Sequence, residues 1–317
     1  MSVIGKYPRV YSARDLKDKC TTGTFSSKEN GMNADQRNFT TQDIEYLSHG
    51  DKTLNLRLFK PSGVDPAPIV VDIHGGAWNN GDLTGCQARD EVLAEAGFAV
   101  AALDFRQAGD GYPTSLIDIN YAIRWLKGSA KEFGIDPTRM GISGQSSGGH
   151  LAMLSAMRPQ DPRYTEIALD IDSSSVDASV KCVGMMWPVI NPLSRYRHAL
   201  RSRASANPGD WVGNLPESHD RYWGTEENMK EGNPMLALER KEPVKTPPAI
   251  WVQGKPDIVH DYRDPESDTG VNEPERFVRN YREAGGKIEL LYVDISERSS
   301  FGSFKILADF YREHLSS

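Results

Sequence analysis

Cysteine is scarce in this sequence, which has three in 317 residues. Cys20, Cys86 and Cys182 are scattered along the chain, without the spacing of metal ligands. An odd and sparse set of cysteines is typical of proteins from a reducing compartment. It argues against a disulfide framework and therefore against a small secreted domain held together by disulfides.

Long hydrophobic runs are missing as well. No apolar stretch approaches the roughly 20 residues that a membrane-spanning helix needs. The first six residues, Met1 to Lys6, lack the apolar core of a secretory signal peptide. Together these absences predict a cytoplasmic protein that does not associate with a membrane.

The sequence also lacks an excess of basic residues. Lys and Arg number 37 against 44 Asp and Glu, and the formal net charge is −7. Nucleic-acid binding needs a basic face, so this class of partner is excluded. The one locally basic stretch covers residues 194–203. We interpret it as the solvated face of a helix, with a site for an anionic ligand as the alternative.

Predicted strands and helices alternate along most of the chain. We expect strands over residues 54–59, 69–73, 98–103, 139–143, 180–187, 249–253 and 288–293. Helices are expected over 91–96, 116–133, 148–157, 273–284 and 303–314. This order predicts an α/β fold, with a mostly parallel sheet and helices on both of its faces.

The domain organisation follows from the segments outside this alternation. Residues 1–42 are polar and aperiodic and are interpreted as an N-terminal arm. Residues 43–317 are predicted to form a single domain. Within it, the long polar segment at about 191–238 is expected to be a helical cap insertion, because a structureless loop of that length is improbable in a compact domain.

The strongest chemical motif is Gly144-Gln145-Ser146-Ser147-Gly148, which stands between a predicted strand and a predicted helix. A serine in such a turn is exposed above the sheet, and the strained backbone tolerates only small neighbours. The helix N-terminus behind it favours negative charge developing close by. Ser146 is therefore predicted to be a nucleophile.

A second motif, His74-Gly75-Gly76-Ala77-Trp78, follows a buried strand. Its glycines allow backbone N–H groups to approach a substrate oxygen. Gly75 and Gly76, with the amide of Ser147, are the predicted oxyanion hole. His74 is interpreted as a structural residue of this loop, and His150, in the helix after Ser146, as structural too.

These two motifs resemble those of the hormone-sensitive-lipase-like and feruloyl-esterase-like (BD-FAE-like) branch of the α/β-hydrolases. Residues 103–106, 112–113, 133–139, 222–225 and 233–234 match that branch as well. The resemblance covers roughly residue 45 to the C-terminus. It implies the α/β-hydrolase fold and a serine hydrolase that acts on carboxylic esters without a metal or cofactor.

The resemblance also implies an acid and a base for the nucleophile. The acid belongs in a Gly-x-x-Asp turn, here Gly254 to Asp257, where the alternative is a turn-capping aspartate. The base should be a histidine after the last strand, but residues 292–302 contain none. Matching the following Phe puts Ser299 at that position, whereas counting from the strand puts Glu297 there.

Three explanations of this missing histidine stay open. The first is that another residue has replaced the base. The second is that the base comes from elsewhere in the chain, with His260 as the nearest candidate. The third is that the scaffold has lost hydrolysis and kept binding or another reaction. His260 is equally interpretable as a surface residue of its loop. A lyase or isomerase reusing the oxyanion hole, and a catalytically silent ligand-binding protein, are therefore the alternatives to an esterase.

The predicted substrate is a small, apolar or aromatic ester. The expected substrate-binding residues are Trp78, Trp187, Tyr222 and His260. Ordinary core packing is the alternative for these aromatic residues, above all for Trp187. No cofactor, metal, nucleic acid or membrane partner is expected, and a homodimer is compatible with the sequence.

Overall fold

The computed structural model describes residues 37–169 and 176–316. Most of the predicted N-terminal arm lies outside these residues, as does Cys20. The arm was expected to extend to residue 42, but β1 already begins at Phe39. Its side chains are mostly exposed, so the hydrophobic alternation that identifies a strand in sequence is weak there.

Within the described residues, eight strands form one sheet in the order β1-β2-β4-β3-β5-β6-β7-β8. At one edge β1 pairs antiparallel with β2, and β2 pairs antiparallel with β4. From β4 through β3, β5, β6 and β7 to β8, the strands are parallel to one another. The strands are β1 (Phe39–His49), β2 (Lys52–Pro61), β3 (Ala67–Ile73), β4 (Ala99–Leu103), β5 (Ile135–Gln145), β6 (Val183–Met186), β7 (Ala249–Lys255) and β8 (Ile288–Asp294).

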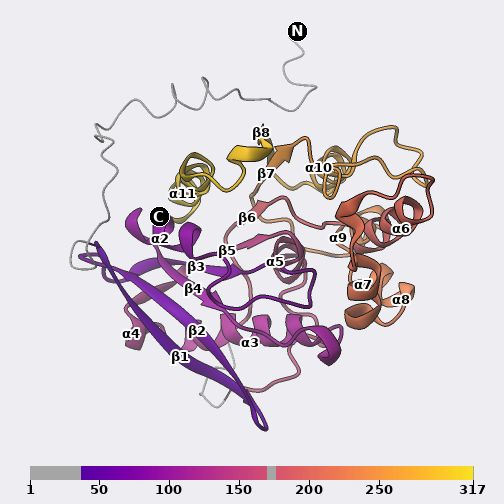
Figure 1. Ribbon diagram of the computed structural model, residues 1–317. Helices are drawn as coiled ribbons and strands as arrows, with labels where there is room; N and C mark the ends of the chain where they lie inside the picture. The colour runs from indigo at the N-terminus through magenta and orange to yellow at the C-terminus, as the bar shows by residue number, and fades with distance from the viewer. Residues whose placement is uncertain (1–36, 170–175, 317) are drawn as a thin grey trace.

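The helices are distributed around this sheet (Figure 1). They are α2 (Gln87–Glu95), α3 (Thr114–Gly128), α4 (Ala130–Phe133), α5 (Ser147–Met157), α6 (Pro192–Arg203), α7 (Leu215–Trp223), α8 (Glu226–Glu231), α9 (Pro234–Glu239), α10 (Glu273–Glu283) and α11 (Phe301–Leu315). Short 3₁₀ helices are η2 (Ala108–Asp110), η3 (Asp210–Val212) and η4 (Ile295–Glu297).

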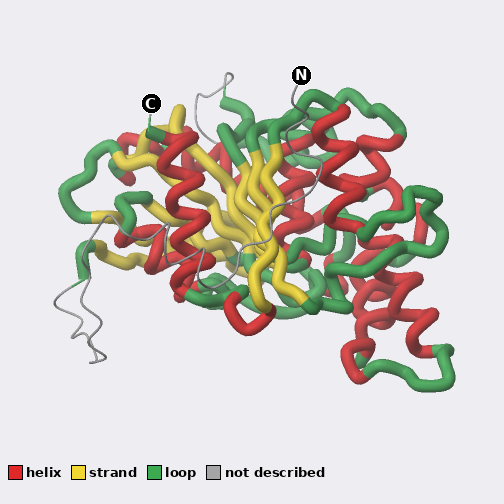
Figure 2. The backbone as a smooth tube through the Cα atoms, turned by 90° about the horizontal axis from the view of Figure 1, so that it is seen from above, coloured by secondary structure: helices red, strands yellow, loops and turns green. Residues whose placement is uncertain are grey.

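Each face of the sheet carries its own hydrophobic core, and Figure 2 shows the strands running between helices. Side chains of α3, α5 and α10 pack on one face, and those of α2 and α11 on the other. Strand β3 is buried throughout and contributes to both, with Val71 in the first core and Val70 in the second. A strand buried on both faces explains the continuous apolar run in its sequence.

The segment between β6 and β7, expected to be a helical insertion, contains α6, η3, α7, α8 and α9. Its helices gather at one end of the molecule in Figure 1. Polar side chains cap the N-termini of several of these helices. Asn191 accepts from the N–H of Ser194 at the start of α6, and Asn233 accepts from that of Leu236 at the start of α9. Such N-caps satisfy backbone donors that the first turn of a helix leaves free.

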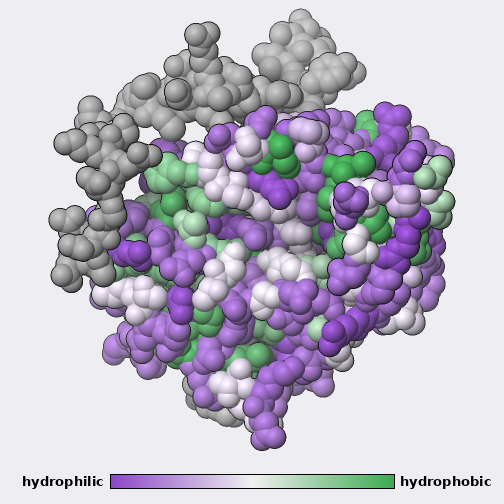
Figure 3. Space-filling view, in the orientation of Figure 1, coloured by the Kyte–Doolittle hydropathy of each residue, from purple (hydrophilic) through white to green (hydrophobic). Residues whose placement is uncertain are grey.

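The surface agrees with the polar composition. The face in Figure 3 is mainly hydrophilic, with separate hydrophobic patches. Among the described residues, the large apolar side chains that are exposed are Leu200, Ile258 and Phe301. In the same part of the chain, no helix is both long and apolar enough to cross a membrane.

Candidate active site

Ser146 lies in the turn between β5 and α5, where the sequence pattern placed it. Its backbone φ is 51° and its ψ −121°, a strained conformation for any residue but glycine. The turn is held from both sides. The Ser146 N–H donates to the carbonyl of Met186 at 3.0 Å, and the Ser146 carbonyl accepts from the N–H of Val189 at 2.9 Å.

The glycines around Ser146 are required by close backbone contacts. A Cβ on Gly144 would lie 2.3 Å from the carbonyl oxygen of Gly148. A Cβ on Gly148 would lie 2.2 Å from the carbonyl oxygen of Ile73, at the end of β3. Any larger residue at these positions would push α5 away from the sheet, and this is why the sequence has glycine on both sides of the serine.

The loop after β3 packs against the same turn. A Cβ on Gly75 would lie 3.4 Å from the Cβ of Ser146, so the Gly75 backbone is directly beside the serine. Gly76 has a φ of +118°, and Trp78 has a positive φ of 61°. His74 Nδ1 donates to the carbonyl of Gly75 at 2.7 Å, which fixes the loop from inside. The loop therefore brings its backbone next to Ser146, as the predicted oxyanion hole requires.

The structure brings an imidazole to Ser146 from the loop after β7. His260 Nε2 lies 3.1 Å from Ser146 Oγ, within hydrogen-bond distance. The other ring nitrogen, Nδ1, lies 2.9 Å from Asp257 Oδ2 and 3.2 Å from Oδ1. Ser146, His260 and Asp257 thus form a continuous chain of hydrogen bonds, in the arrangement of a serine-hydrolase triad.

The turn containing Asp257 explains why two residues only three apart meet. Asp257 Oδ1 accepts from the backbone N–H of Val259 at 3.1 Å and from that of His260 at 3.2 Å. This turn folds the chain back, so that the His260 ring lies over the carboxylate. Gln253 Nε2 donates to Oδ2 at 3.2 Å. Asp257 therefore caps its turn and also orients the imidazole.

Burial and charge set the protonation of this pair. Burial lowers the pKa of His260 below its ordinary value, although Asp257 acts to raise it. Burial opposes ionisation of Asp257, but the hydrogen bond from His260 and nearby positive charge outweigh it, and its pKa is lowered. An ionised carboxylate next to a neutral imidazole is the state in which Nε2 accepts a proton.

The loop after β8, for which the sequence predicted the base, does not reach Ser146 with Ser299 or Glu297. Both side chains are exposed. The loop instead turns Arg298 inward, with Nη1 3.4 Å from Asp257 Oδ2 and the guanidinium 4.8 Å from the centre of the Trp187 ring. The sequence pattern did not show that Asp257 and His260, three residues apart on one turn, face each other.

Two of the expected substrate-binding aromatics are packed in the interior. Trp78 and Tyr222 are each 1% exposed and stack at 5.9 Å, and Trp223 adds to the same cluster. Trp187 is 6% exposed and lies under Arg298. Core packing therefore accounts for Trp78 and Tyr222 without a substrate. Among the residues that the structure describes, no three His, Cys, Asp or Glu side chains gather as metal ligands.

The architecture and this site show that the chain has the α/β-hydrolase fold, with a serine in the turn between β5 and α5. Among solved structures it resembles carboxyl esterase 2 of Tuber melanosporum, with a TM-score of 0.66, 17% identity and coverage of 88% and 89% of the two chains. An esterase of Pyrobaculum calidifontis gives a TM-score of 0.64 at 18% identity, covering 86% of this chain and 85% of that one. At such identities the likeness establishes the fold.

The sequence places the chain more closely. The BD-FAE family model matches residues 56–264, more than half of the chain, and the chain belongs to this family. A probable carboxylic ester hydrolase, LipM, of Mycobacterium tuberculosis is 31% identical over 192 residues, or 56% of this chain and 44% of LipM. An arylesterase of Saccharolobus solfataricus is 30% identical over 148 residues, or 43% of this chain and 48% of the relative. The matches span about half the length of these relatives.

Proposed function

We propose that this chain is a carboxylic ester hydrolase in which Ser146 is the nucleophile, His260 the general base and Asp257 the carboxylate that orients it. The observation that carries the proposal is the pair of contacts on the His260 ring. Nε2 is 3.1 Å from Ser146 Oγ, and Nδ1 is 2.9 Å from Asp257 Oδ2. The esterase names of the curated relatives support the same activity.

The direction of proton transfer that we propose is consistent with these hydrogen bonds. Asp257 is an acceptor, so Nδ1 of His260 carries the hydrogen and Nε2 is free to take the proton of Ser146. Oγ then attacks the ester carbonyl carbon. The oxygen of the tetrahedral intermediate accepts hydrogen bonds from backbone N–H groups of Gly75, Gly76 and Ser147.

Collapse of this intermediate breaks the bond to the leaving alcohol. His260 returns the proton to the alcohol oxygen as it departs, leaving an acyl group on Ser146. Water then attacks the acyl carbonyl carbon while His260 takes a proton from the water. When this second intermediate collapses, the bond between the acyl carbon and Ser146 Oγ breaks, His260 returns the proton to Oγ, and the carboxylic acid is released. Each step needs the same imidazole between serine and carboxylate.

The substrate is proposed to be a small carboxylic ester. A preference for an aromatic acyl group stays a prediction, because Trp78 and Tyr222 pack against each other. The alternatives, a silent ligand-binding protein and a lyase or isomerase, rested on the absence of a base. These alternatives are no longer needed if His260 is the base. A cytoplasmic location and a homodimeric state stay predictions as well.

Hydrolysis of p-nitrophenyl acetate tests the proposal. We expect turnover by the chain as it stands, loss of turnover in Ser146→Ala, and labelling of Ser146 by a fluorophosphonate probe. Ser299→His is expected to change the rate little, because position 299 is exposed. A chain that is inactive until Ser299→His is introduced would contradict the role of His260.

A further inference from the structure

Three charged residues are buried beside the turn of Ser146, although the proposed mechanism uses none of them. Arg89 on α2 and Asp72 on β3 are each 1% exposed, and Asp90 on α2 is fully buried. Arg89 Nη2 lies 2.8 Å from Asp72 Oδ1 and 2.9 Å from Oδ2. A buried ion pair contributes little net stability, because both charges lose their hydration. The position of this pair beside the active-site loops therefore calls for a further role.

The negative charge of this group resides on Asp72. Burial opposes ionisation of Asp72, but the charge of Arg89 outweighs it, and the pKa of Asp72 is lowered. Burial and the charge of Asp72 together raise the pKa of Asp90 well above its usual value. Asp72 is therefore the carboxylate that neutralises Arg89. Because Asp72 is bound through Nη2, the Nη1 donors of the guanidinium are left for a neutral acceptor.

That acceptor is Gln145, the residue directly before Ser146. Arg89 Nη1 donates to Gln145 Oε1 at 3.3 Å. The register of β3 and β5 explains why one arginine reaches both of its partners. Asp72 lies opposite Ser143, and Gln145 follows two positions later on the same strand. Side chains two residues apart on a strand share a face of the sheet, so Asp72 and Gln145 both point toward α2.

Asp72 and Gln145 belong to the two segments that carry the proposed oxyanion hole. Asp72 stands three residues before Gly75 on the strand that leads into its loop. The Gln145 side chain packs against this loop, because a Cβ on Gly75 would lie 3.5 Å from Gln145 Cγ. N–H groups of Gly75 and Ser147 must converge on one oxygen to stabilise it. Arg89 thus ties the end of β3 to the turn of Ser146 where the two segments meet.

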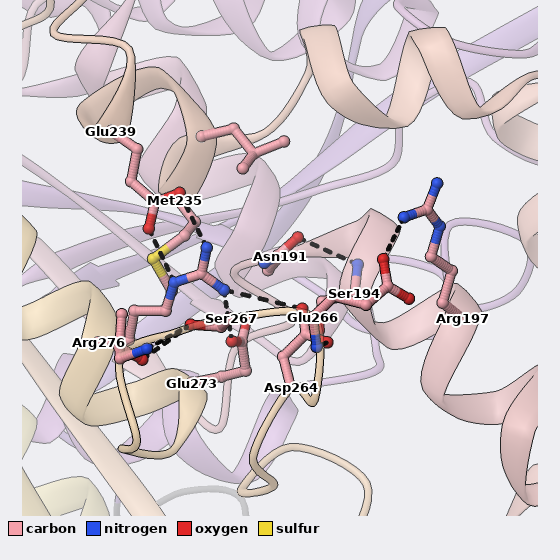
Figure 4. A network of polar contacts seen from close by, with 12 residues as sticks. Asn191, Ser194, Arg197, Met235, Glu239, Asp264, Glu266, Ser267, Glu273 and Arg276 are labelled. Carbon is pink, nitrogen blue, oxygen red and sulfur yellow. Dashed lines mark hydrogen bonds and ion pairs between the residues drawn. The ribbon is translucent and has the colours of Figure 1, made fainter.

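A second buried arginine provides a contrast. Arg276 on α10 is 7% exposed, and its guanidinium contacts the carboxylates of Glu239, Glu273 and Asp264, as Figure 4 shows. These contacts join α10 to the cap helix α9 and to the loop before α10. Arg89 differs from Arg276 because one of its partners is the side-chain amide of the residue next to Ser146.

We propose that Arg89 is a positioning residue of the active site. By holding Asp72 and Gln145 together, it fixes the Gly75 loop against the turn of Ser146 and keeps the oxyanion hole in the geometry that the transition state needs. The inference rests on the proposed esterase function. Contacts to the oxyanion are made mainly in the transition state, so loss of this bridge should lower kcat and leave KM nearly unchanged.

Two substitutions separate the bridge from the ion pair. Gln145→Leu removes the acceptor and leaves the pair of Asp72 and Arg89 in place. Arg89→Lys keeps a positive charge beside Asp72, but an ammonium group lacks the planar fork that reaches both partners. For each variant we expect kcat on p-nitrophenyl butyrate to fall about 10- to 100-fold, the range for losing a hydrogen bond to a charged group, with KM within about threefold.

The double variant Gln145→Leu/Arg89→Lys tests whether the two residues act as one unit. Its kcat should be about as low as that of the single variants, because the same bridge is lost in each. Affinity for a trifluoromethyl ketone, which adds Ser146 Oγ and places an oxyanion in the hole, should fall by the same factor as kcat. Affinity for a neutral ketone without fluorine should not.

Arg124→Met is the matched control. Arg124 is also a buried arginine, 8% exposed, and its Nε donates to Asn120 on the same helix, α3. Its replacement should lower the Tm and leave kcat within about twofold of wild type. Thermal unfolding shows which variants fold. If Arg89→Lys does not fold, Gln145→Leu, at a partly exposed position, still decides the question.

The outcomes separate this inference from the proposed function. Folded variants that keep kcat within about threefold of wild type, or losses that add up in the double variant, overturn the role of Arg89 and leave the esterase function standing. If the wild type hydrolyses no ester, the esterase function fails, and amide hydrogen exchange over residues 74–80 decides the role of Arg89 alone. Faster exchange in Gln145→Leu than in Arg124→Met supports it, and equal exchange overturns it.

Discussion

Replacement of His260 by alanine is the sharpest test of the active site. The imidazole stands between Ser146 Oγ, at 3.1 Å, and Asp257 Oδ2, at 2.9 Å. Without it, the serine must lose its proton to water as it attacks. Removing the histidine of a serine-hydrolase triad costs roughly 10⁶ in kcat, or about 8 kcal/mol in the barrier. We expect a loss of that order, with the oxyanion hole retaining a small residual rate.

Initial rates on p-nitrophenyl butyrate, with the fraction of folded enzyme measured by circular dichroism, give the comparison. His314→Ala is the matched control, because that ring packs on Phe310 in α11, a helix outside the triad. It should leave the rate within about twofold of wild type. A His260→Ala variant that folds normally and keeps more than a tenth of the activity would refute the assignment of the base.

Three further predictions concern charge and protonation. Asp257→Asn should lower kcat about 10⁴-fold, because the tautomer of His260 is then no longer held, as single-turnover rates would show. Activity should fall as pH drops through the pKa of His260, which burial keeps below its ordinary value. Arg298→Gln should move this acid limb to higher pH by removing a nearby cation, visible in a kcat/KM profile. Burial lowers the pKa of His150 to about 4, and its Nδ1 accepts from Trp78 Nε1. The pKa of His150 is therefore lower in the folded state than in the unfolded state. Its contribution to the free energy of unfolding is complete above about pH 6.5 and is lost as the pH falls toward 4. In urea unfolding, His150 should account for about 3 kcal/mol of the loss of stability over that range, and His150→Gln should remove that share.

Local patterns in the sequence were sufficient to predict the fold and to place Ser146 in its strand-to-helix turn. The strand–turn–helix around Ser146 is a short-range feature, and its glycines are required by contacts within the same few residues and the end of β3. The alternation of apolar strands and amphipathic helices likewise predicts a parallel sheet, because the spacing of apolar residues along the chain differs between strands and helices. Strand β1 could not be predicted in this way, because it lies at an edge with few buried side chains.

The identity of the proposed base depended on tertiary structure. Both candidate loops follow strands of the same sheet edge, and a sequence shows neither which of them reaches Ser146 nor which side chain it turns inward. The loop after β8 presents Arg298 to Asp257, while the turn of Asp257 folds His260 onto the serine.

The environment of a charged side chain, such as that of Arg195, also depended on tertiary structure. Within the basic stretch 194–203, Arg195 is one arginine among several, and composition cannot distinguish it from Arg197 or Arg201. The helix N-terminus fixed by Asn191 turns it into the core beside His260, whereas the others meet glutamates at the surface. The sequence determined the framework and the strand-to-helix turn that holds Ser146, because those depend on neighbours in the chain. The partner of each charge and the position of the imidazole depend on segments far apart in sequence, which only folding brings together.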